Sequence, residues 1–343
     1  MKYTRKEIDR TGKLLASTNP NEVKQAIDKL NDWRSLHLLP LDVLQNKIEE
    51  FLKFNNVRPL LISRRLKRLT SILSKLKMNK DMGLGGMQDI GGLRVVVDTV
   101  DTLLYLQSLL RSIPIEKFEC RRIYDYINEP KESGYRSVHY AYIYHSENKD
   151  YDGLRIELQI RTKLQHLWAT AVETAGLYTN TSLKASQGEK KWLEFFQIVS
   201  SLFSFKEKLP IIRKLRTHSM RDLMVKCYTL NKANKFSDIL KALNVSVHQN
   251  PTVRDAYYYL IYINFEAKRV KIKFFTKEEE TSASNLYVKL EKELKNGKNA
   301  AVLVSVNEVN ELREAYPSYF LDTEEFTSNI DKICLNCKNW GFV

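Results

Sequence analysis

Apolar residues recur along the chain with two different spacings, and the change of spacing divides it into regions. Over residues 1–80 they recur every three or four positions, as in VKQAIDKLNDWRSL and LDVLQNKIEEFLKF, which predicts amphipathic helices. The basic run at 63–77, SRRLKRLTSILSKLK, has the same spacing and is also predicted to be helical. A glycine-rich break, MGLGGMQDIGG, follows this run, and the pattern beyond it is that of strands.

Three strands and two helices are expected between this break and residue 180. The β-branched run LRVVVD at 93–98 is typical of a buried strand, and the segments at 139–145 and 154–160 alternate apolar and polar residues as strands do. A crossover helix is expected between the first two strands, and a longer helix over 162–178. Together these elements predict a mixed α/β domain.

Four regions are expected in total. The α/β domain at 63–185 follows N-terminal helices at 1–62, and helical spacing returns at 186–250, which is interpreted as a helical connector. The last region, 251–343, is predicted to be a compact β-β-α-β-α unit with its own core. The expected fold class is therefore α/β (α+β): a mixed-sheet domain flanked by helices, plus a small C-terminal α/β domain.

Charge is the informative feature of the composition. Lys and Arg number 55 against 41 Asp and Glu, a formal net charge of +14. Such a balance favours a polyanionic partner such as RNA or a nucleotide, and a basic surface without a specific partner explains it equally well. No apolar run approaches a membrane span, and four cysteines do not make a disulfide framework, so a cytoplasmic protein with no membrane partner is expected.

Cations and a hydroxyl are concentrated on the predicted basic helix. Lys67, Ser71 and Lys75 are spaced four residues apart, so they would share one helix face, with Arg65 nearby. Such a face suits a triphosphate, while a solvated charged face is the ordinary alternative.

Two carboxylates are associated with the predicted strands. Asp89 comes just before the strand at 93–98, and Glu157 lies within the strand at 154–160. Such a pair can hold Mg²⁺ together with phosphate oxygens, and a carboxylate can also accept the proton of an attacking hydroxyl. Glu157 is equally well explained as the outward residue of an alternating strand.

The loop PKESGYRSVHY combines groups that could hold a nucleotide. Lys131 and Arg136 are phosphate-binding residue types, the Tyr135 ring can stack on a base, and Gly134 permits a tight turn. On the following helix, the spacing of His166 and Glu173 places both on one face. The loop is interpreted as a clamp for an acceptor nucleotide.

Four segments together resemble the synthetase domain of the RelA/SpoT family over about residues 60–180. They are the basic run at 63–77, DIGGLRVVVD, YDYINEPKESGYRSVHY and IELQIRT. This resemblance implies a nucleotidyltransferase-like domain that uses Mg²⁺ and transfers pyrophosphate from ATP to the 3′-hydroxyl of a guanine nucleotide. It assigns catalysis and metal binding to Asp89 and Glu157. It assigns ATP binding to Arg65, Lys67, Ser71, Lys75 and, ahead of YDYI, Arg121 or Arg122. It assigns the acceptor site to Lys131, Tyr135, Arg136, His139, Gln159, Arg161, His166 and Glu173.

A second resemblance concerns the C-terminal region. AVLVSVNEVNELREAYPSYFLDTEEF resembles the C-terminal part of fused, CapRel-type toxin–antitoxin proteins. It implies a toxin that pyrophosphorylates the 3′ end of tRNA, is restrained by its own C-terminal domain and is triggered by a phage protein. An alarmone synthetase that uses GTP or GDP, and an inactive nucleotide-binding module, are the alternatives.

Two smaller features belong to the C-terminal region. A run of tyrosines is interpreted either as a regulatory surface or as a strand with alternate core positions; its members are Tyr257, Tyr258, Tyr259 and Tyr262. Cys334 and Cys337 form a C-x2-C pair with no second pair to complete four ligands, so zinc is not expected.

Overall fold

The strands of the computed structural model form one eight-stranded sheet with the order β3-β4-β5-β2-β1-β8-β6-β7. The structure describes residues 2–79, 81–179, 183, 188–244, 257–264, 269–276, 278–293, 299–305 and 323–343. β2 and β5 are parallel, and every other neighbouring pair is antiparallel. The strands are β1 (Leu61–Leu66), β2 (Gly91–Val97), β3 (Phe118–Asp125), β4 (Val138–Tyr144), β5 (Arg155–Thr162), β6 (Tyr258–Asn264), β7 (Arg269–Phe275) and β8 (Asn299–Ser305).

Helices surround the sheet, and several begin at residues that favour helix starts. Thr4 and Ser219 form capping boxes at the first residues of α1 and α8. Among the helices that the structure describes, none combines the length and apolar character needed to cross a membrane. The helices are α1 (Arg5–Leu14), α2 (Pro20–Ser35), α3 (Leu38–Phe54), α4 (Leu69–Met78), α5 (Val100–Ser112), α6 (Lys163–Thr179), α7 (Lys190–Glu207), α8 (Met220–Asn234), α9 (Phe236–Asn244), α10 (Glu280–Glu293) and α12 (Glu324–Asn339).

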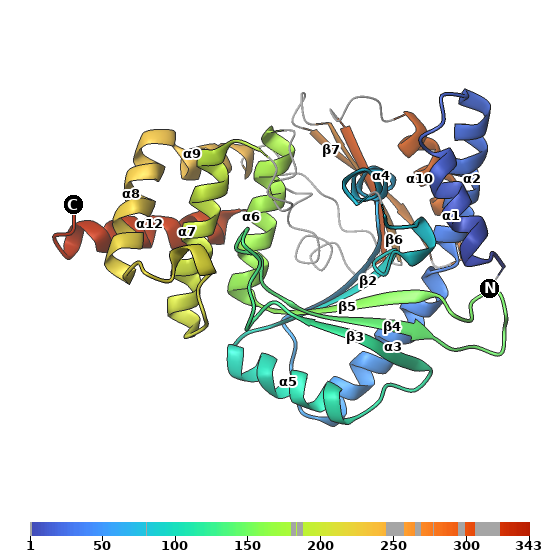
Figure 1. Cartoon of the computed structure of the whole chain (residues 1–343), viewed down its shortest axis with the longest axis horizontal. Helices are drawn as coiled ribbons and strands as arrows, with labels where there is room; N and C mark the ends of the chain where they lie inside the picture. Colours follow the sequence, from blue (N-terminus) through green and yellow to red (C-terminus); the bar gives the residue numbers. More distant parts are fainter. Residues whose placement is uncertain are drawn as a thin grey trace.

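The first five strands have one apolar and one polar face, because successive side chains of a strand point to opposite sides. Leu93 and Val95 of β2 and Ile156 and Leu158 of β5 belong to one buried cluster. The same cluster contains side chains of α3 and α5, which cover this side of the sheet (Figure 1). The predicted mixed α/β fold is confirmed. The side chains at the intervening positions of these strands point to the opposite, polar face of the sheet.

The prediction of a helix starting at residue 63 is wrong for its first part. Residues Leu61–Leu66 form β1, and α4 begins only at Leu69. Lys67 therefore lies in the connection before the helix and does not share a helix face with Ser71. The cause is tertiary: β1 pairs with β2 along its whole length, and such pairing overrides a local helical spacing.

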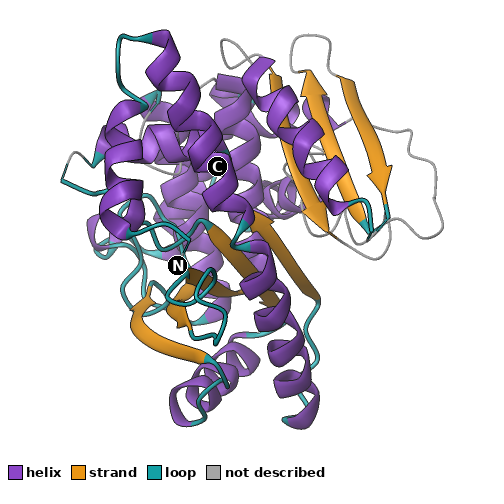
Figure 2. Ribbon diagram, turned by 90° about the vertical axis from the view of Figure 1, so that its right-hand side faces the viewer, coloured by secondary structure: helices purple, strands orange, loops and turns teal. Residues whose placement is uncertain are grey.

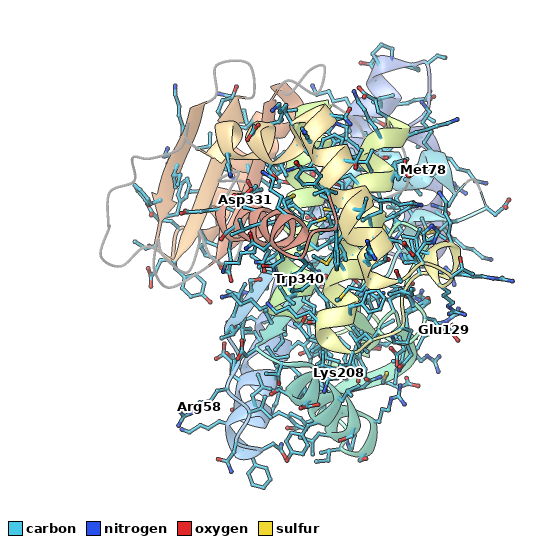
Figure 3. All side chains as sticks on the ribbon, turned by 90° about the vertical axis from the view of Figure 1, so that its left-hand side faces the viewer. Arg58, Met78, Glu129, Lys208, Asp331 and Trp340 are labelled. Carbon is cyan, nitrogen blue, oxygen red and sulfur yellow. The ribbon has the colours of Figure 1, made fainter. Side chains whose placement is uncertain are left out.

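β3 and α12 are elements that the sequence patterns did not predict. β3 carries charged residues and a register shift between Cys120 and Arg122, which hides its alternation. α12 packs against α6, α8 and α9, and Figure 3, in which its residues Asp331 and Trp340 are labelled, shows it beside these helices. Phe326 and Ile330 of this helix are buried in one cluster with Trp192 and Phe195 of α7.

The described C-terminal strands continue the sheet beyond β1. Val304 of β8 pairs with Arg65 of β1, and β8 is followed by β6 and β7 (Figure 2). α10 packs against these strands, and the small core between them includes Tyr258 and Tyr287. The helix predicted near 309–316 lies outside the described residues. The limits of the four expected regions remain predictions.

Candidate functional site

The polar face of the sheet brings charged residues from four strands into two rows. In the first row, the strand registers place Glu157 beside Gly92 and Gly92 beside Arg65. On the other side of Glu157, Ala141 and then Arg122 continue this row. Paired residues of neighbouring strands point to the same face, so these side chains share one surface.

The second row lies one pleat further along the strands. It runs from Tyr124 through His139, Gln159 and Arg94 to Ser63. The two rows together give a cationic surface around a carboxylate, since Arg65, Arg94 and Arg122 surround Glu157.

A closed ring of hydrogen bonds fixes the side chains around Glu157. The His139 ring contacts the Glu157 carboxylate with Nδ1 at 3.0 Å and the Tyr135 hydroxyl with Nε2 at 2.8 Å. The Gln159 amide donates to the other Glu157 oxygen at 2.5 Å and accepts from Arg161 at 2.7 Å. Arg161 also reaches the Tyr135 hydroxyl at 3.5 Å, which closes the ring. These groups were predicted from separate motifs, and the structure brings them together.

The charges in this ring support each other. Burial disfavours a charged His139, but the oxygens of Tyr135 and Glu157 outweigh burial and raise the pKa of the imidazole. Burial likewise acts to raise the pKa of Glu157, but His139 and the Gln159 amide hold it below its ordinary value. Glu157 is therefore an ionised carboxylate in a site where its side chain is only 10% exposed.

Asp89 is the centre of a second polar cluster next to Glu157. Lys67 Nζ lies 2.7 Å from one carboxylate oxygen and Lys75 Nζ lies 2.9 Å from the other. Burial opposes ionisation of Asp89, but the two ammonium groups outweigh it and hold the pKa of this carboxyl far below its usual range. The negative charge of Asp89 also acts on Glu157, which places the two carboxylates in one electrostatic environment.

This arrangement fits a hard cation that takes some of its ligands from the substrate. Within the described ranges, no group of three His, Cys, Asp or Glu side chains converges as a metal site. Mg²⁺ is commonly held by one or two carboxylates together with substrate phosphates and water, which is what Asp89 and Glu157 could provide. Phosphate oxygens would also suit Lys67 and Lys75.

Tyr135 is buried in this structure, with 2% of its surface exposed. Its ring lies 6.0 Å from Tyr126 and 6.5 Å from Trp168 between ring centroids, and Lys131 lies above both tyrosines. The Tyr135 and Tyr126 rings thus form an aromatic wall with a cation over it. Stacking of an acceptor base on Tyr135 remains a prediction.

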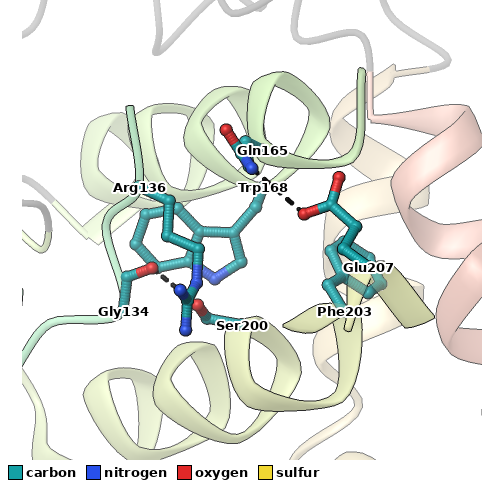
Figure 4. A pocket seen from close by; sticks show the side chains of 7 residues that line it. All are labelled: Gly134, Arg136, Gln165, Trp168, Ser200, Phe203 and Glu207. Carbon is teal, nitrogen blue, oxygen red and sulfur yellow. Dashed lines mark hydrogen bonds between the residues drawn. The ribbon is translucent and has the colours of Figure 1, made fainter. Parts of the chain in front are cut away.

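Arg136 points away from this wall, into the contact between the loop and α7. Its guanidinium donates to the Pro210 carbonyl at 2.5 Å and to the Ile127 carbonyl at 3.3 Å. Figure 4 shows Arg136 beside Trp168 and Ser200, and the Ser200 hydroxyl donates to the Gly134 carbonyl at 2.6 Å. The hollow between these groups has a volume of only about 10 Å³. Such a volume has room for about one water molecule and none for a nucleotide. The position of Arg136 therefore favours a role in holding the loop in place rather than in binding phosphate.

Other predicted residues are placed around the two clusters. Arg65 and Ser71 are half-buried on β1 and α4. Arg122 is exposed, with its guanidinium 4.8 Å from the centre of the Tyr124 ring, and Arg121 pairs with Glu119. His166 is buried and Glu173 half-buried on α6, which follows β5 directly. Their assigned roles remain predictions.

The predicted tyrosine run has different environments along its length. The Tyr257 hydroxyl accepts from Arg64 at 2.6 Å and donates to Asp42 at 3.3 Å, which links it to β1 and α3. Tyr258 is buried in the small C-terminal core, and Tyr262 is half-buried. The side chain of Tyr259 lies outside the described residues. A regulatory role for this run remains a prediction.

A contact from α10 reaches Lys67 through one buried arginine. Arg34 is 2% exposed, and it donates to the Tyr287 hydroxyl at 2.8 Å and to the Lys67 carbonyl at 2.7 Å. Lys67 in turn binds Asp89. The described C-terminal region is therefore linked, through Arg34, to Lys67, a residue that is predicted to bind ATP.

Arg94 is a site residue that the sequence analysis missed. It lies on β2 between Ser63 and Gln159, on the face that carries Glu157. Strand alternation within LRVVV, with Leu93 and Val95 in the core, is the signal that could have assigned it to the polar face.

Comparison with known proteins shows what the part of the chain that carries this face is similar to. Residues 64–182 match the family model described as "Region found in RelA / SpoT proteins". This segment is therefore similar to that region of RelA/SpoT proteins. It contains both carboxylates, the Tyr135 loop and four of the five strands that form the polar face, together with the second half of β1.

Two curated relatives match 32% and 42% of the chain. The GTP pyrophosphokinase YjbM of Bacillus subtilis is 35% identical over 113 residues, which are 32% of this chain and 52% of the relative. The GTP pyrophosphokinase rsh of Brucella melitensis is 30% identical over 149 residues, which are 42% of this chain and 18% of the relative. The chain thus spans about half or less of these two relatives.

Solved structures of small alarmone synthetases are also similar. Small alarmone synthetase 1 of Bacillus subtilis is 26% identical, with a TM-score of 0.45, and the match covers 53% of this chain and 93% of that one. The same enzyme bound to its product pppGpp is 25% identical with a TM-score of 0.44, covering 53% and 92%.

Proposed function

We propose that this chain is an ATP-dependent pyrophosphokinase of the RelA/SpoT type, which transfers pyrophosphate to a 3′-hydroxyl. The observation that carries the proposal is the juxtaposition of two clusters on the polar face. One is the Asp89 carboxylate with its two lysines, and the other is the Glu157 carboxylate with its hydrogen-bonded ring. The similarity of the chain to GTP pyrophosphokinases supports the same reaction.

The donor would lie over Gly92, between α4 and the sheet. Lys67 and Lys75 leave Asp89 for the triphosphate oxygens, and Arg65 and Arg94 flank the nucleotide. Mg²⁺, held by Asp89 and Glu157, would neutralise charge that develops on the transferred group. Positioning and charge neutralisation of this kind supply most of the catalysis in phosphoryl transfer.

The acceptor would lie on the other side of Glu157, toward Tyr135. Its 3′-oxygen attacks the β-phosphorus of ATP, the bond from this phosphorus to the α,β-bridging oxygen breaks, and AMP leaves. Glu157 accepts the hydroxyl proton, and His139 holds the carboxylate in the orientation that the transfer needs. The closed ring keeps these groups in place before substrate arrives.

Two acceptors are distinguished by different observations. A tRNA 3′ end is favoured by the net charge of +14 and by the arginines on the polar face, because a tRNA offers many phosphates. A free guanine nucleotide, giving a (p)ppGpp-type product, is favoured by the similarity to relatives that are named GTP pyrophosphokinases. We propose tRNA as the acceptor, with the guanine nucleotide as the second candidate.

The experiment uses ATP labelled at the γ-phosphate, with GTP, GDP and bulk tRNA offered separately. Labelled tRNA, with a steep loss of transfer as salt rises, is the result that supports the proposal. Labelled GTP or GDP alone would instead establish the second candidate. Absence of label in all three, with a folded protein and Mg²⁺ present, would overturn the pyrophosphokinase assignment.

A toxin restrained by its own C-terminal region, and released by a phage protein in anti-phage defence, is the proposed biological setting. The Tyr287–Arg34–Lys67 contact supports such restraint, because Tyr287 of α10 holds the backbone of Lys67, a residue proposed to bind ATP, through Arg34. A partner that binds the released state better would shift the population toward activity. Tyr287→Phe should then raise basal transfer; transfer that stays unchanged or falls would contradict restraint through this contact.

A further inference from the structure

A second hollow lies beside the transfer site, between the N-terminal helices and the hairpin that joins β4 and β5. Its volume is about 260 Å³, against about 10 Å³ for the hollow behind Arg136. It is lined by Arg5 and Ile8 of α1, Trp33 of α2, the Gly85–Met87 segment, and Arg155 at the start of β5. Neither the proposed donor site nor the proposed acceptor site uses these residues.

Two guanidinium groups from distant parts of the chain meet at Gly86. Arg155 donates to the Gly86 carbonyl at 3.1 Å. A Cβ built on Gly86 would lie 3.2 Å from a terminal nitrogen of Arg5, and one built on Gly85 would lie 2.9 Å from the Arg5 Cγ. The glycines of the break thus let the Arg5 side chain lie across the backbone, with its charged end close to that of Arg155.

The positive charges at this point repel each other. Burial lowers the pKa of Arg155, and the nearby charges of Arg5 and Arg121 lower it further. Asp9 is the acidic partner on this side: it lies 3.8 Å from Arg5 and accepts from the Gly85 amide at 2.8 Å. Arg121 pairs with Glu119, so Asp9 is the carboxylate beside Arg5 and Arg155, and an anion bound between these two guanidinium groups would relieve their repulsion.

The remaining wall of the hollow is apolar. Ile8, Trp33, Met87, Ile143 and Leu154 contribute to it. A mostly apolar concavity with a few convergent polar groups is the usual form of a small-ligand site, and its polar groups indicate the ligand class. Paired guanidinium groups are suited to phosphate oxygens, and the apolar wall is suited to a sugar or base.

We propose that this hollow is a second phosphate-binding site, which takes the phosphate group of a nucleotide on Arg5 and Arg155. Arg155 shares the polar face of β5 with Glu157, about 7 Å further along the strand, and Gly86 precedes Asp89 by three residues. A nucleotide in the hollow would thus lie next to both carboxylates without occupying the place of the donor or the acceptor. Its binding does not depend on the proposed transfer reaction.

Calorimetry on the full chain tests this site, with GDP, pyrophosphate and guanosine as probes and no ATP present. Hydrogen exchange with mass spectrometry gives the location, because peptides covering 83–88 and 63–78 report the hollow and the donor side separately. We expect GDP to protect 83–88 and to bind more tightly than pyrophosphate, and guanosine not to bind there.

The matched variants are Arg5→Ala and Arg10→Ala, which remove the same charge from α1 inside and outside the hollow. Arg5→Ala should weaken the GDP binding that protects 83–88 at least about tenfold, the loss expected for one charge-assisted hydrogen bond, and Arg10→Ala should leave it unchanged. Arg155→Lys keeps the charge but not the fork and should weaken it as well. Equal weakening by Arg5→Ala and Arg10→Ala, or no protection of 83–88, would overturn the site. Equal binding of pyrophosphate and GDP would overturn the assignment to a nucleotide.

Discussion

The two faces of the central sheet are built from the same five strands, yet they differ in almost every physical respect. On the face toward α3 and α5, Leu93, Val95 and Leu158 are fully buried among other apolar side chains. On the other face, Arg94, Glu157 and Gln159 occupy the intervening positions. The core face requires volume and shape, whereas the polar face requires charge and hydrogen-bond geometry.

Neighbouring residues of one strand therefore serve stability and chemistry separately. Glu157 and Leu158 are adjacent in sequence and point to opposite faces of β5. If this division holds, substitutions on the polar face mainly change the rate of transfer, and substitutions on the core face mainly change the free energy of unfolding.

The largest effect is expected for Glu157→Gln. The variant keeps the shape of the side chain but removes the carboxylate that we propose accepts the proton, so we expect the transfer rate to fall roughly 10²–10⁴-fold. The free energy of unfolding should fall only by the contribution of the His139–Glu157 pair, about 1.5–3 kcal/mol. Single-turnover transfer of labelled phosphate measures the rate, and full activity of the folded variant would remove Glu157 from its proposed role.

Leu158→Ala is the matched change on the core face. It removes buried volume next to Ile156 and Tyr140, and we expect it to lower the free energy of unfolding by about 2–5 kcal/mol. Transfer per folded molecule, measured below the unfolding transition, should stay close to that of the wild type. A variant with unchanged stability and lost transfer would contradict the division between the faces.

A smaller, pH-dependent effect is expected for His139→Gln. The pKa of His139 is raised above its ordinary value of 6.5, so its contribution to stability is complete below that value and is lost as pH rises through the folded-state pKa. The pKa of Glu157 is lowered from 4.5, so its contribution is complete above 4.5 and is lost as pH falls. The pair is thus strongest between these two values.

Denaturant unfolding of wild type and His139→Gln over a range of pH checks this. The difference in unfolding free energy should be about 1.5–3 kcal/mol near pH 5.5, the amount typical of a hydrogen bond to a charged group, and it should shrink as pH rises through the folded-state pKa of His139. A difference that grows toward alkaline pH would show that His139 stabilises Glu157 as a neutral ring.

The comparison of the two faces also explains what the sequence could predict. β2, β4 and β5 were predictable because their apolar positions meet a core on one side, and Glu157 stood out as a carboxylate among them. β1 was not, because LISRRL continues without a break into a genuine helix, and only its pairing with β2 makes it a strand. Arg94 was missed although the same alternation places it beside Gln159.

The loop was predictable in composition but not in orientation. Lys131 and Tyr135 lie together, with the cation above the ring. Arg136 instead points toward Pro210, because α7 and the turn after it pack on the loop. That contact joins residues 74 positions apart, and no local pattern reports such a distance.

The central claim is that a nucleotide occupies the polar face over Gly92, and the two adjacent glycines of β2 test it most directly. A Cβ on Gly92 would meet only the backbone oxygens of Arg65 and Glu157, both at 4.0 Å, whereas a Cβ on Gly91 would meet Ile156 at 2.9 Å and Leu41 at 3.1 Å. The measurement is ATP affinity by calorimetry, beside thermal unfolding, for Gly92→Val and Gly91→Ala. We predict that Gly92→Val unfolds like the wild type and loses ATP binding, while Gly91→Ala is destabilised by about 1–3 kcal/mol and, where folded, still binds ATP. Wild-type ATP affinity in a folded Gly92→Val protein would contradict the account.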